Sequence, residues 1–102
     1  MRNLGHGAQA DTEGLLGWLT AYESDRREIL NAFAEIEGKP VDEWPKTLVR
    51  SLAPEESLFL LSPNKSLRVF FRLEDSGRKT ILNVSMQEAI DRLLGRKPQE
   101  AT

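Results

Sequence analysis

The side chains with the clearest chemical potential lie in SLRVFFRLEDSGRKTILNVS, residues 66–85. If this segment is extended, Arg68, Phe70 and Arg72 project from one face, because successive side chains of a strand alternate between faces. The opposite face is apolar throughout and requires a core: Leu67, Val69, Phe71 and Leu73. Arginine binds phosphate and stabilises negative charge that develops on it. The arginine face is therefore a candidate surface for a phosphate backbone, for another protein, or for water alone.

Metal-free RNA cleavage is one chemistry that such a face could support. The ribose 2′-hydroxyl attacks the adjacent phosphorus, so the protein needs only to position the backbone and stabilise the oxyanion. We predict Arg68 and Arg72 as the catalytic, phosphate-stabilising residues. The predicted RNA and phosphate contacts are Arg50, Lys65, Lys46 and a base stacked on Phe70. The alternative is that alternating charge only keeps an exposed sheet face hydrated and unaggregated.

Several other chemistries lack the residues they need. The chain has no cysteine and a single histidine, His6, so a zinc site and a Ser-His-Asp arrangement are both excluded. No glycine pattern matches a phosphate-binding loop or a dinucleotide fingerprint. The sequence therefore predicts no metal and no cofactor.

Composition indicates one ordinary globular domain. The chain has 102 residues, of which 39% are hydrophobic and 29% charged. Residues 1–45 carry four basic and nine acidic side chains, whereas residues 46–79 carry seven basic and four acidic ones. A mildly basic middle segment is compatible with an anionic partner. The absence of cysteine, of a secretory signal and of a membrane-length apolar run predicts a cytoplasmic protein.

Helical spacing of apolar residues predicts a helical hairpin after a flexible tail at residues 1–11. Asp11 or Thr12 can cap the first helix. Its expected buried stripe, with Trp18 at the border, is Leu15, Leu16, Leu19 and Tyr22. Asp25 and Glu28 form a plausible capping pair for a second helix, which Gly38 ends and whose apolar positions include Ile29, Phe33 and Ile36. Residues 41–54 are predicted as a short helical turn with one apolar face: Trp44, Leu48 and Leu52.

The second half of the chain predicts a small sheet. Extended segments at 57–62, 67–74 and 80–85 are separated by the short turns PNKS and DSGRK, which favour a three-stranded antiparallel meander. A capping-box pattern at 85–88 begins a last helix. We expect an α+β domain over residues 12–95, with the hairpin packed on the meander and a polar tail at 96–102. The predicted core is Trp44, Phe71, Leu58 or Leu60, Val69, Ile29, Phe33, Ile90 and Leu94.

The ordered set of elements and motifs resembles the RelE/ParE/HigB superfamily of bacterial toxins. That pattern is a helical hairpin, a lysine-x-leucine segment, then L-[YF]-E-L-R, then [Y]-R-V-x-[YF], an apolar last strand and a helix. Here VRSLAPEESLFLLSPNKSLRVFFRL runs parallel to it, and the similarity covers about residues 12–94. The matching positions are Arg50, Leu58, Phe59, Leu61, Arg68, Val69 and Phe71. The family also opens with a strand, for which residues 1–14 show no pattern.

The resemblance implies a toxin-like component of a bacterial or phage toxin–antitoxin system, with a small antitoxin as its partner. Members mostly cleave mRNA on the ribosome or poison DNA gyrase, so the implied activity includes a metal-independent endoribonuclease. Ser62 stands where the family often has an arginine, and the only tyrosine, Tyr22, lies in the first predicted helix. The alternative function is a non-catalytic protein-interaction module that uses the same fold to bind a protein partner.

Overall fold

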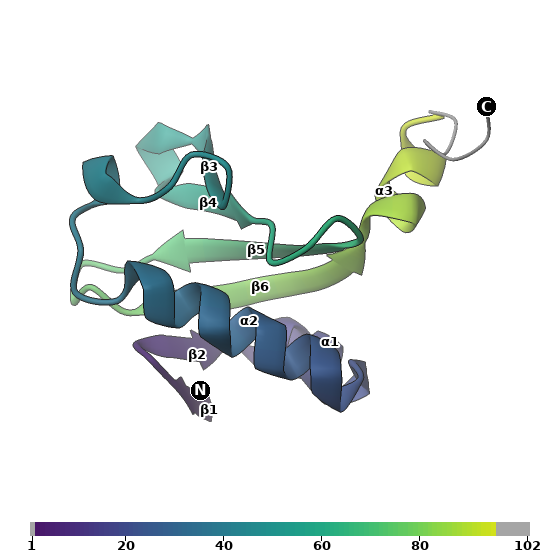
Figure 1. The fold of residues 1–102 in the computed structure, drawn as a ribbon, viewed down its shortest axis with the longest axis horizontal. Coiled ribbons are helices and arrows are strands. Elements are labelled where there is room, and N and C mark those ends of the chain that lie inside the picture. The colour runs from purple at the N-terminus through teal and green to yellow at the C-terminus, as the bar shows by residue number, and fades with distance from the viewer. Residues whose placement is uncertain (1, 96–102) are drawn as a thin grey trace.

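The computed structural model describes residues 2–95 and contains one mixed sheet with three α-helices (Figure 1). The longest helix has 14 residues, and no helix in the described part of the chain is long and apolar enough to cross a membrane. In chain order the elements are β1 (Arg2–Gly5), β2 (Ala8–Ala10), α1 (Thr12–Thr20), α2 (Glu23–Ile36), η1 (Val41–Glu43), β3 (Val49–Ala53), η2 (Pro54–Glu56), β4 (Leu58–Leu61), β5 (Leu67–Leu73), β6 (Lys79–Met86) and α3 (Gln87–Leu93).

The sheet has six strands in the order β1-β2-β6-β5-β4-β3, so the expected three-stranded sheet is wrong in size. The meander itself is confirmed, because β4, β5 and β6 pair antiparallel in succession. Beyond it, β3 pairs antiparallel with β4 on one side. On the other side β2 runs parallel to β6 and β1 closes the edge. The α+β class is retained, with a larger and mixed sheet.

The N-terminal segment expected to be a flexible tail instead forms the β1–β2 hairpin. Its turn at Gly5, His6 and Gly7 is built from three residues with positive φ, a conformation that glycine adopts without strain. Gly7 accepts a hydrogen bond from the backbone N–H of Lys79 at 2.9 Å. Ala8 and Ala10 are fully buried because β2 lies inside the sheet. Alanine has low strand propensity, so pairing on both sides, rather than local preference, makes this strand.

Helix α1 packs closely on the sheet through its glycines. Asp11 caps the helix as predicted, with its carboxylate accepting from the N–H of Gly14 at 2.8 Å. Of the predicted stripe only Leu15 packs against the core, since Leu16 is 67% exposed, Leu19 51% and Tyr22 80%. The buried residues of the helix are Gly14 and Trp18. A Cβ on Gly14 would lie 1.9 Å from the carbonyl oxygen of Ile81. The bare glycine backbone therefore lets α1 approach β6 closely, and this approach fixes which face is buried.

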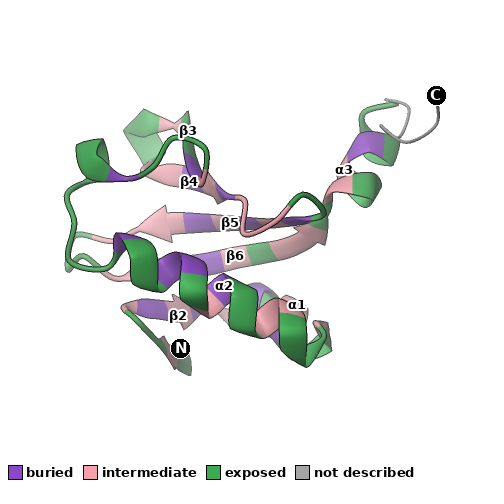
Figure 2. Cartoon of the chain, viewed as in Figure 1, coloured by how far each residue is buried: buried purple, intermediate pink, exposed green. Residues whose placement is uncertain are grey.

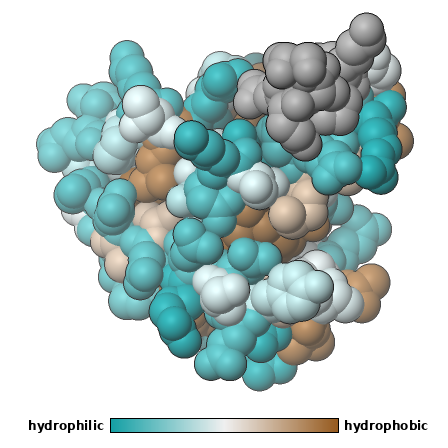
Figure 3. Space-filling model, turned by 45° about the vertical axis from the view of Figure 1, so that its right-hand side comes forward, coloured by the Kyte–Doolittle hydropathy of each residue, from teal (hydrophilic) through white to brown (hydrophobic). Residues whose placement is uncertain are grey.

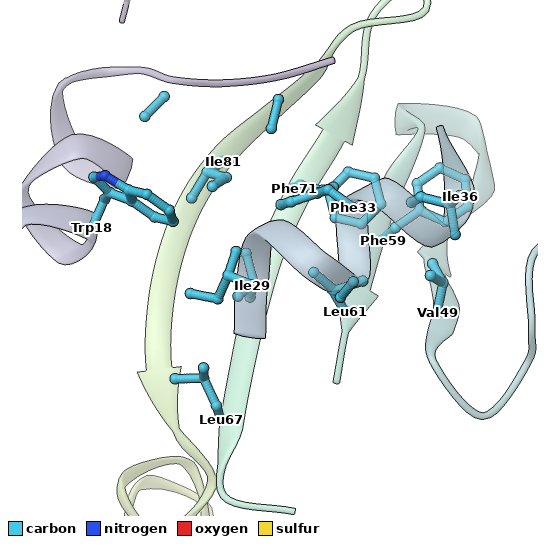
Figure 4. Packing of buried hydrophobic residues seen from close by; sticks show 14 of the residues in the cluster. Trp18, Ile29, Phe33, Ile36, Val49, Phe59, Leu61, Leu67, Phe71 and Ile81 are labelled. Atoms are coloured by element: carbon cyan, nitrogen blue, oxygen red, sulfur yellow. The ribbon is translucent and has the colours of Figure 1, made fainter. Parts of the chain in front are cut away.

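Helix α2 supplies the centre of the core, as its spacing predicts. Its buried residues are Ile29, Ala32, Phe33 and Ile36. It begins at Glu23 after Tyr22, with no side-chain cap, so the predicted capping pair is wrong. Phe33 meets Phe71 of β5 edge to face at a centroid distance of 5.3 Å (Figure 4). Stacking of Phe59 on Phe71 at 5.5 Å extends the aromatic cluster toward β4.

Residues 41–54 do not form the predicted helical turn. The helical part is limited to η1, and the chain then enters the edge strand β3. Trp44 is buried beside Phe59, and its indole N–H donates to the carbonyl of Lys39 at 3.0 Å. Leu52 instead lies on β3 with 40% of its surface exposed. Trp44, which follows η1, and Leu52, on β3, therefore do not share one helical face, although their spacing in the sequence suggests it.

The other core predictions are correct on β5 and wrong on β4, and at α3 neither predicted residue is fully buried. Val69 and Phe71 are buried as predicted, and the strand alternates between buried and half-buried residues (Figure 2). On β4 the buried residues are Phe59 and Leu61, so the choice of Leu58 or Leu60 is wrong by one position. On α3, Ile90 is half-buried and Leu94 just beyond it is 64% exposed. That helix starts after Met86 with no side-chain cap, so the predicted capping box is wrong as well.

A β-bulge in β6 decides which of its residues face the helices. Phe70 is paired with Asn83, but the next residue, Phe71, is paired with Ile81, so Leu82 is extra. Without the extra residue, 81 and 83 would share a face, since strand side chains alternate. With it, Ile81 and Val84 both lie against α1, at Gly14 and Gly17 respectively. Asn83 is left on the opposite face, beside Phe70.

Candidate nucleic-acid interface

A groove of about 790 Å³ lies on the sheet face opposite α1 and α2. Its floor is formed by β3, β4, β5 and β6, and α3 contributes one wall. The groove is lined by basic Arg50, Lys65 and Arg68, by apolar Leu52, Leu60, Phe70, Ile90, Leu93 and Leu94, and by polar Ser62, Asn83, Ser85 and Gln87. The groove therefore combines cations with an apolar and aromatic surface.

The strand register arranges the floor in a straight row across four strands. Arg50 is opposite Leu60, Leu60 is opposite Phe70, and Phe70 is opposite Asn83. Because neighbouring strands are about 4.8 Å apart, Arg50 lies roughly 10 Å from Phe70 along this row. Phe70 is half-buried, so one part of its ring is available to a ligand. The row thus places an aromatic ring between a cation and an amide.

Arg68 is held at the end of the groove by the β4–β5 loop. Its Nη1 donates to the carbonyl oxygens of Asn64 and Leu67, each at 2.7 Å. Asn64 fixes the loop in turn, since its Oδ1 accepts from the N–H groups of Ser66 and Leu67 at 2.8 and 2.9 Å. The guanidinium has five N–H donors, so further donors remain for a phosphate. Arg68 is therefore an ordered cation rather than a freely moving one.

The charge of the groove is positive and its chemistry is limited. Among the described residues that line it, none carries a carboxylate, an imidazole or a phenol. The cations can bind an anion and stabilise an oxyanion, and Phe70 can stack on a base. For proton transfer, the described lining offers one titratable ammonium group, that of the exposed Lys65. The side chains of the groove are therefore better suited to binding an anionic ligand than to catalysing a reaction on it.

Arg72 lies on the same face of β5 but outside the groove. It is paired with Glu74, with Nε 3.1 Å from Oε1 and Nη2 3.3 Å from Oε2. The hydroxyl of Thr80 donates to the same carboxylate at 3.0 Å. The hydrogen bond to Glu74 raises the pKa of Arg72, and the hydrogen bonds from Arg72 and Thr80 lower the pKa of Glu74. The positive charge of Arg72 is thus neutralised by Glu74 within the β5–β6 turn.

Lys46 lies at a second, smaller pocket of about 410 Å³ beside the edge strand β3. Trp44, Val49 and Phe59 give this pocket an apolar base, and Arg50 borders both the pocket and the groove. Of the six predicted site residues, the structure thus places four in one groove: Arg50, Lys65, Arg68 and Phe70. Lys46 and Arg72 lie outside it.

The groove also contains residues that the sequence did not point to. Asn83 and Ser85 come from β6, where the bulge breaks the alternation that would have assigned their face. Gln87 and the apolar wall come from α3, whose leucines were expected in the core. Leu93 is 88% exposed. Figure 3 shows such apolar patches among hydrophilic side chains on the side of the molecule where α1 and α3 lie.

No protein-family model matches the sequence, and no curated protein matches it. Among solved structures, the fold is similar to a chain in the toxin–antitoxin complex RelBE2 from Mycobacterium tuberculosis. The TM-score is 0.47 with 18% sequence identity, and the match covers 78% of this chain and 94% of that chain. At this identity the likeness concerns the fold alone.

Proposed function

We propose that this protein is the toxin-like component of a bacterial or phage toxin–antitoxin pair and that its groove binds single-stranded RNA. One observation carries the proposal: three cations and an aromatic ring line a groove whose described lining includes no acidic side chain. Single-stranded nucleic acid is bound by positively charged grooves with aromatic rings on which bases stack. The resemblance in sequence supplies the toxin–antitoxin context.

The spacing of the groove residues suits a nucleotide chain. A base stacked on Phe70 has Arg68 two residues along the same strand, about 7 Å away, and Arg50 two strands across, about 10 Å away. The phosphates before and after that base can each meet a guanidinium, and Lys65 adds a third charge at the β4–β5 loop. Arg68 makes the best-ordered contact because the loop carbonyls hold it.

Cleavage in this groove would proceed without a metal ion. Attack by the 2′-oxygen on the adjacent phosphorus would form a 2′,3′-cyclic phosphate and break the bond to the 5′-oxygen, which leaves as the 5′-hydroxyl of the next nucleotide. Solvent would take the proton of the 2′-hydroxyl and supply the proton of the leaving group, while Arg68 would stabilise the negative charge that develops on the phosphoryl oxygens. The described lining holds no carboxylate, imidazole or phenol, and its one titratable ammonium group, on Lys65, is exposed, so we expect binding to be strong relative to cleavage. RNA cleavage that persists in a chelator and is lost in Arg68→Ala would support this step.

A second candidate function is a protein-interaction module, and the apolar wall of the groove favours it. Ile90, Leu93 and Leu94 present hydrophobic surface beside the cations, as a site for an amphipathic acidic segment would. A partner such as an antitoxin could therefore occupy the same groove as RNA. The two functions are distinguished by direct binding of RNA to the isolated protein.

The test is fluorescence anisotropy with a labelled RNA of about eight nucleotides at about 50 mM salt, where electrostatic binding is strong. Each phosphate contact contributes about −0.7 to the slope of log K against log salt for single strands, so three cations predict a slope of about −2. Arg68→Ala should weaken binding and reduce the slope by about 0.7. Arg27→Ala is the matched control, because Arg27 is exposed on α2 and pairs there with Glu23. Absence of binding at low salt would contradict the RNA proposal and favour the interaction module.

A further inference from the structure

The residue opposite the aromatic ring of the groove is an amide, and the β6 bulge puts it there. Phe70 is paired with Asn83 across β5 and β6, and directly opposed residues have Cβ atoms about 5 Å apart. Phe71 is already paired with Ile81, so the apolar Leu82 is omitted from the row. A base stacked on Phe70 would therefore have the side chain of Asn83 at its edge.

The amide of Asn83 is exposed in the groove and held by one neighbour. The hydroxyl of Ser85 donates a hydrogen bond to its Oδ1, which leaves the amide oriented while Nδ2 still has two donors and Oδ1 a further lone pair. The other amides near the groove have intramolecular partners: Gln87 donates to Asp91 at 2.8 Å, and Asn64 to Glu28 at 3.1 Å. Asn83 is thus the amide best placed to meet a base.

We infer that Asn83 reads the base that stacks on Phe70 and selects adenine, an inference that rests on the proposed binding of RNA. An amide pairs with adenine through two hydrogen bonds, donating to N7 and accepting from the N6 amino group. Guanine presents two acceptors, O6 and N7, on the same edge and would leave the amide oxygen without a donor. A purine also offers the larger surface to the ring of Phe70. In this arrangement Arg68 and Arg50 bind the phosphates of the RNA, and Asn83 determines which base is bound at Phe70.

The experiment measures Kd for a set of uridine oligomers of about eight nucleotides that carry one adenine, guanine or cytosine at the centre. Wild type should bind the adenine oligomer about tenfold more tightly than the all-uridine one, within the range of a bidentate amide contact. Asn83→Ala should remove this preference, so that the adenine oligomer and the all-uridine oligomer bind with equal affinity. Asn83→Thr, which suits a strand, should do the same and guards against an effect of alanine on the bulge. Asn31→Ala on the exposed surface of α2 is the matched control.

The outcomes separate the inference from the function on which it rests. Equal affinity of wild type for all oligomers, selection of a base other than adenine, or a preference that survives in both Asn83 variants would overturn the base-reading role and leave RNA binding intact. Failure of the folded wild-type protein to bind any oligomer would overturn both. Phe70→Ala should weaken binding to every oligomer, because a lost stacking surface affects each base.

Discussion

Arg72 and Glu74 form a two-point ion pair that closes the turn between β5 and β6, with N–O distances of 3.1 and 3.3 Å. The pair explains why two arginines on one face of one strand have different surroundings. Arg68 is bonded to neutral carbonyl oxygens and keeps its charge for a ligand, whereas the charge of Arg72 is matched by a carboxylate. Strand alternation places Arg68 and Arg72 on the same face. Their neighbours in the adjoining turns determine that Arg68, and not Arg72, is available to bind an anionic ligand.

Substitution of the two arginines should therefore have unequal effects on RNA binding. Arg68→Ala should weaken binding roughly tenfold or more, as expected for loss of a charged hydrogen bond. Arg72→Ala should change Kd by less than about twofold, since a matched surface charge contributes little at a distance. Titration of both variants with the same labelled RNA measures the difference. Equal losses would show that Arg72 leaves Glu74 when RNA binds.

The ion pair also predicts how stability depends on pH. The pKa of Glu74 is lowered in the folded state, so its contribution is present above the ordinary value of 4.5 and is lost as pH falls through the folded pKa. Wild type should melt at a higher temperature than Glu74→Gln at about pH 6, and the gap should close toward about pH 3. Glu55→Gln, at an exposed position of η2, should show no such gap. A gap that stays constant with pH would rule out the carboxylate as its source.

The close approach of α1 to β6 predicts an unusual glycine effect. Replacing glycine by alanine inside a helix ordinarily stabilises it by up to about 1 kcal/mol. At Gly14 the new Cβ would lie 1.9 Å from a backbone oxygen, so the helix must move away from the sheet. Gly14→Ala should destabilise the fold by about 1–3 kcal/mol, the usual range for overpacking. Thermal unfolding measures it, with Leu16→Ala as a near-neutral control on the exposed side of α1. A more stable Gly14→Ala protein would contradict this packing.

Neighbouring phenylalanines on β5 should respond in opposite ways. Phe71 is fully buried and touches Phe33, Phe59 and Trp44, so Phe71→Ala should cost about 3–5 kcal/mol. Phe70 faces the groove and is half-buried, so Phe70→Ser should leave the fold largely intact. Chemical denaturation of the two variants tests the assigned register. Unfolding of Phe70→Ser would mean that both faces of β5 are required by the core.

Buried Lys79 predicts a second rise of stability with pH, in the alkaline range. It is 5% exposed, and burial lowers its pKa from the ordinary value of 10.5 against an opposing effect of Glu37. Folding then disfavours the protonated lysine, so stability should rise as pH increases from the folded pKa toward the ordinary one. Lys79→Met should be more stable than wild type at about pH 7, with the difference shrinking toward about pH 10. Lys65→Met, at an exposed loop, should not show this trend. A less stable Lys79→Met would show that the contacts with Trp44 and Gly77 outweigh desolvation.

Elements with strong periodicity were predictable from the sequence. In β5 the alternation of apolar and polar residues alone assigns both faces, and in α2 the spacing of Ile29, Phe33 and Ile36 identifies the buried stripe. The short loops between β4, β5 and β6 establish their antiparallel pairing. In each case the information lies within about ten residues of the chain.

The remaining elements depend on contacts between distant residues. The sequence of β2, Ala-Gln-Ala, has little strand propensity and becomes a strand by pairing with β1 on one side and β6 on the other. The glycines of α1 indicate a weak helix, yet they determine its buried face, and Leu16 and Leu19, which the spacing assigns to the core, are exposed. The site divides in the same way. Alternation along β5 brings Arg68 and Phe70 to one surface. The position of Asn83 depends on the bulge in β6, which no local sequence pattern predicts.

The parallel pairing of β2 with β6 has a consequence for the order in which the molecule is assembled during translation. Gln9 and Thr80 are bonded through their side chains although they lie 71 positions apart. Ribosomes add about 5–20 residues per second, so β2 must wait several seconds after its synthesis for β6. Until β6 is complete, helix α1 also lacks the backbone against which Gly14 packs. Strand β2 is thus synthesised long before β6 and can join the rest of the sheet only after β6 has formed.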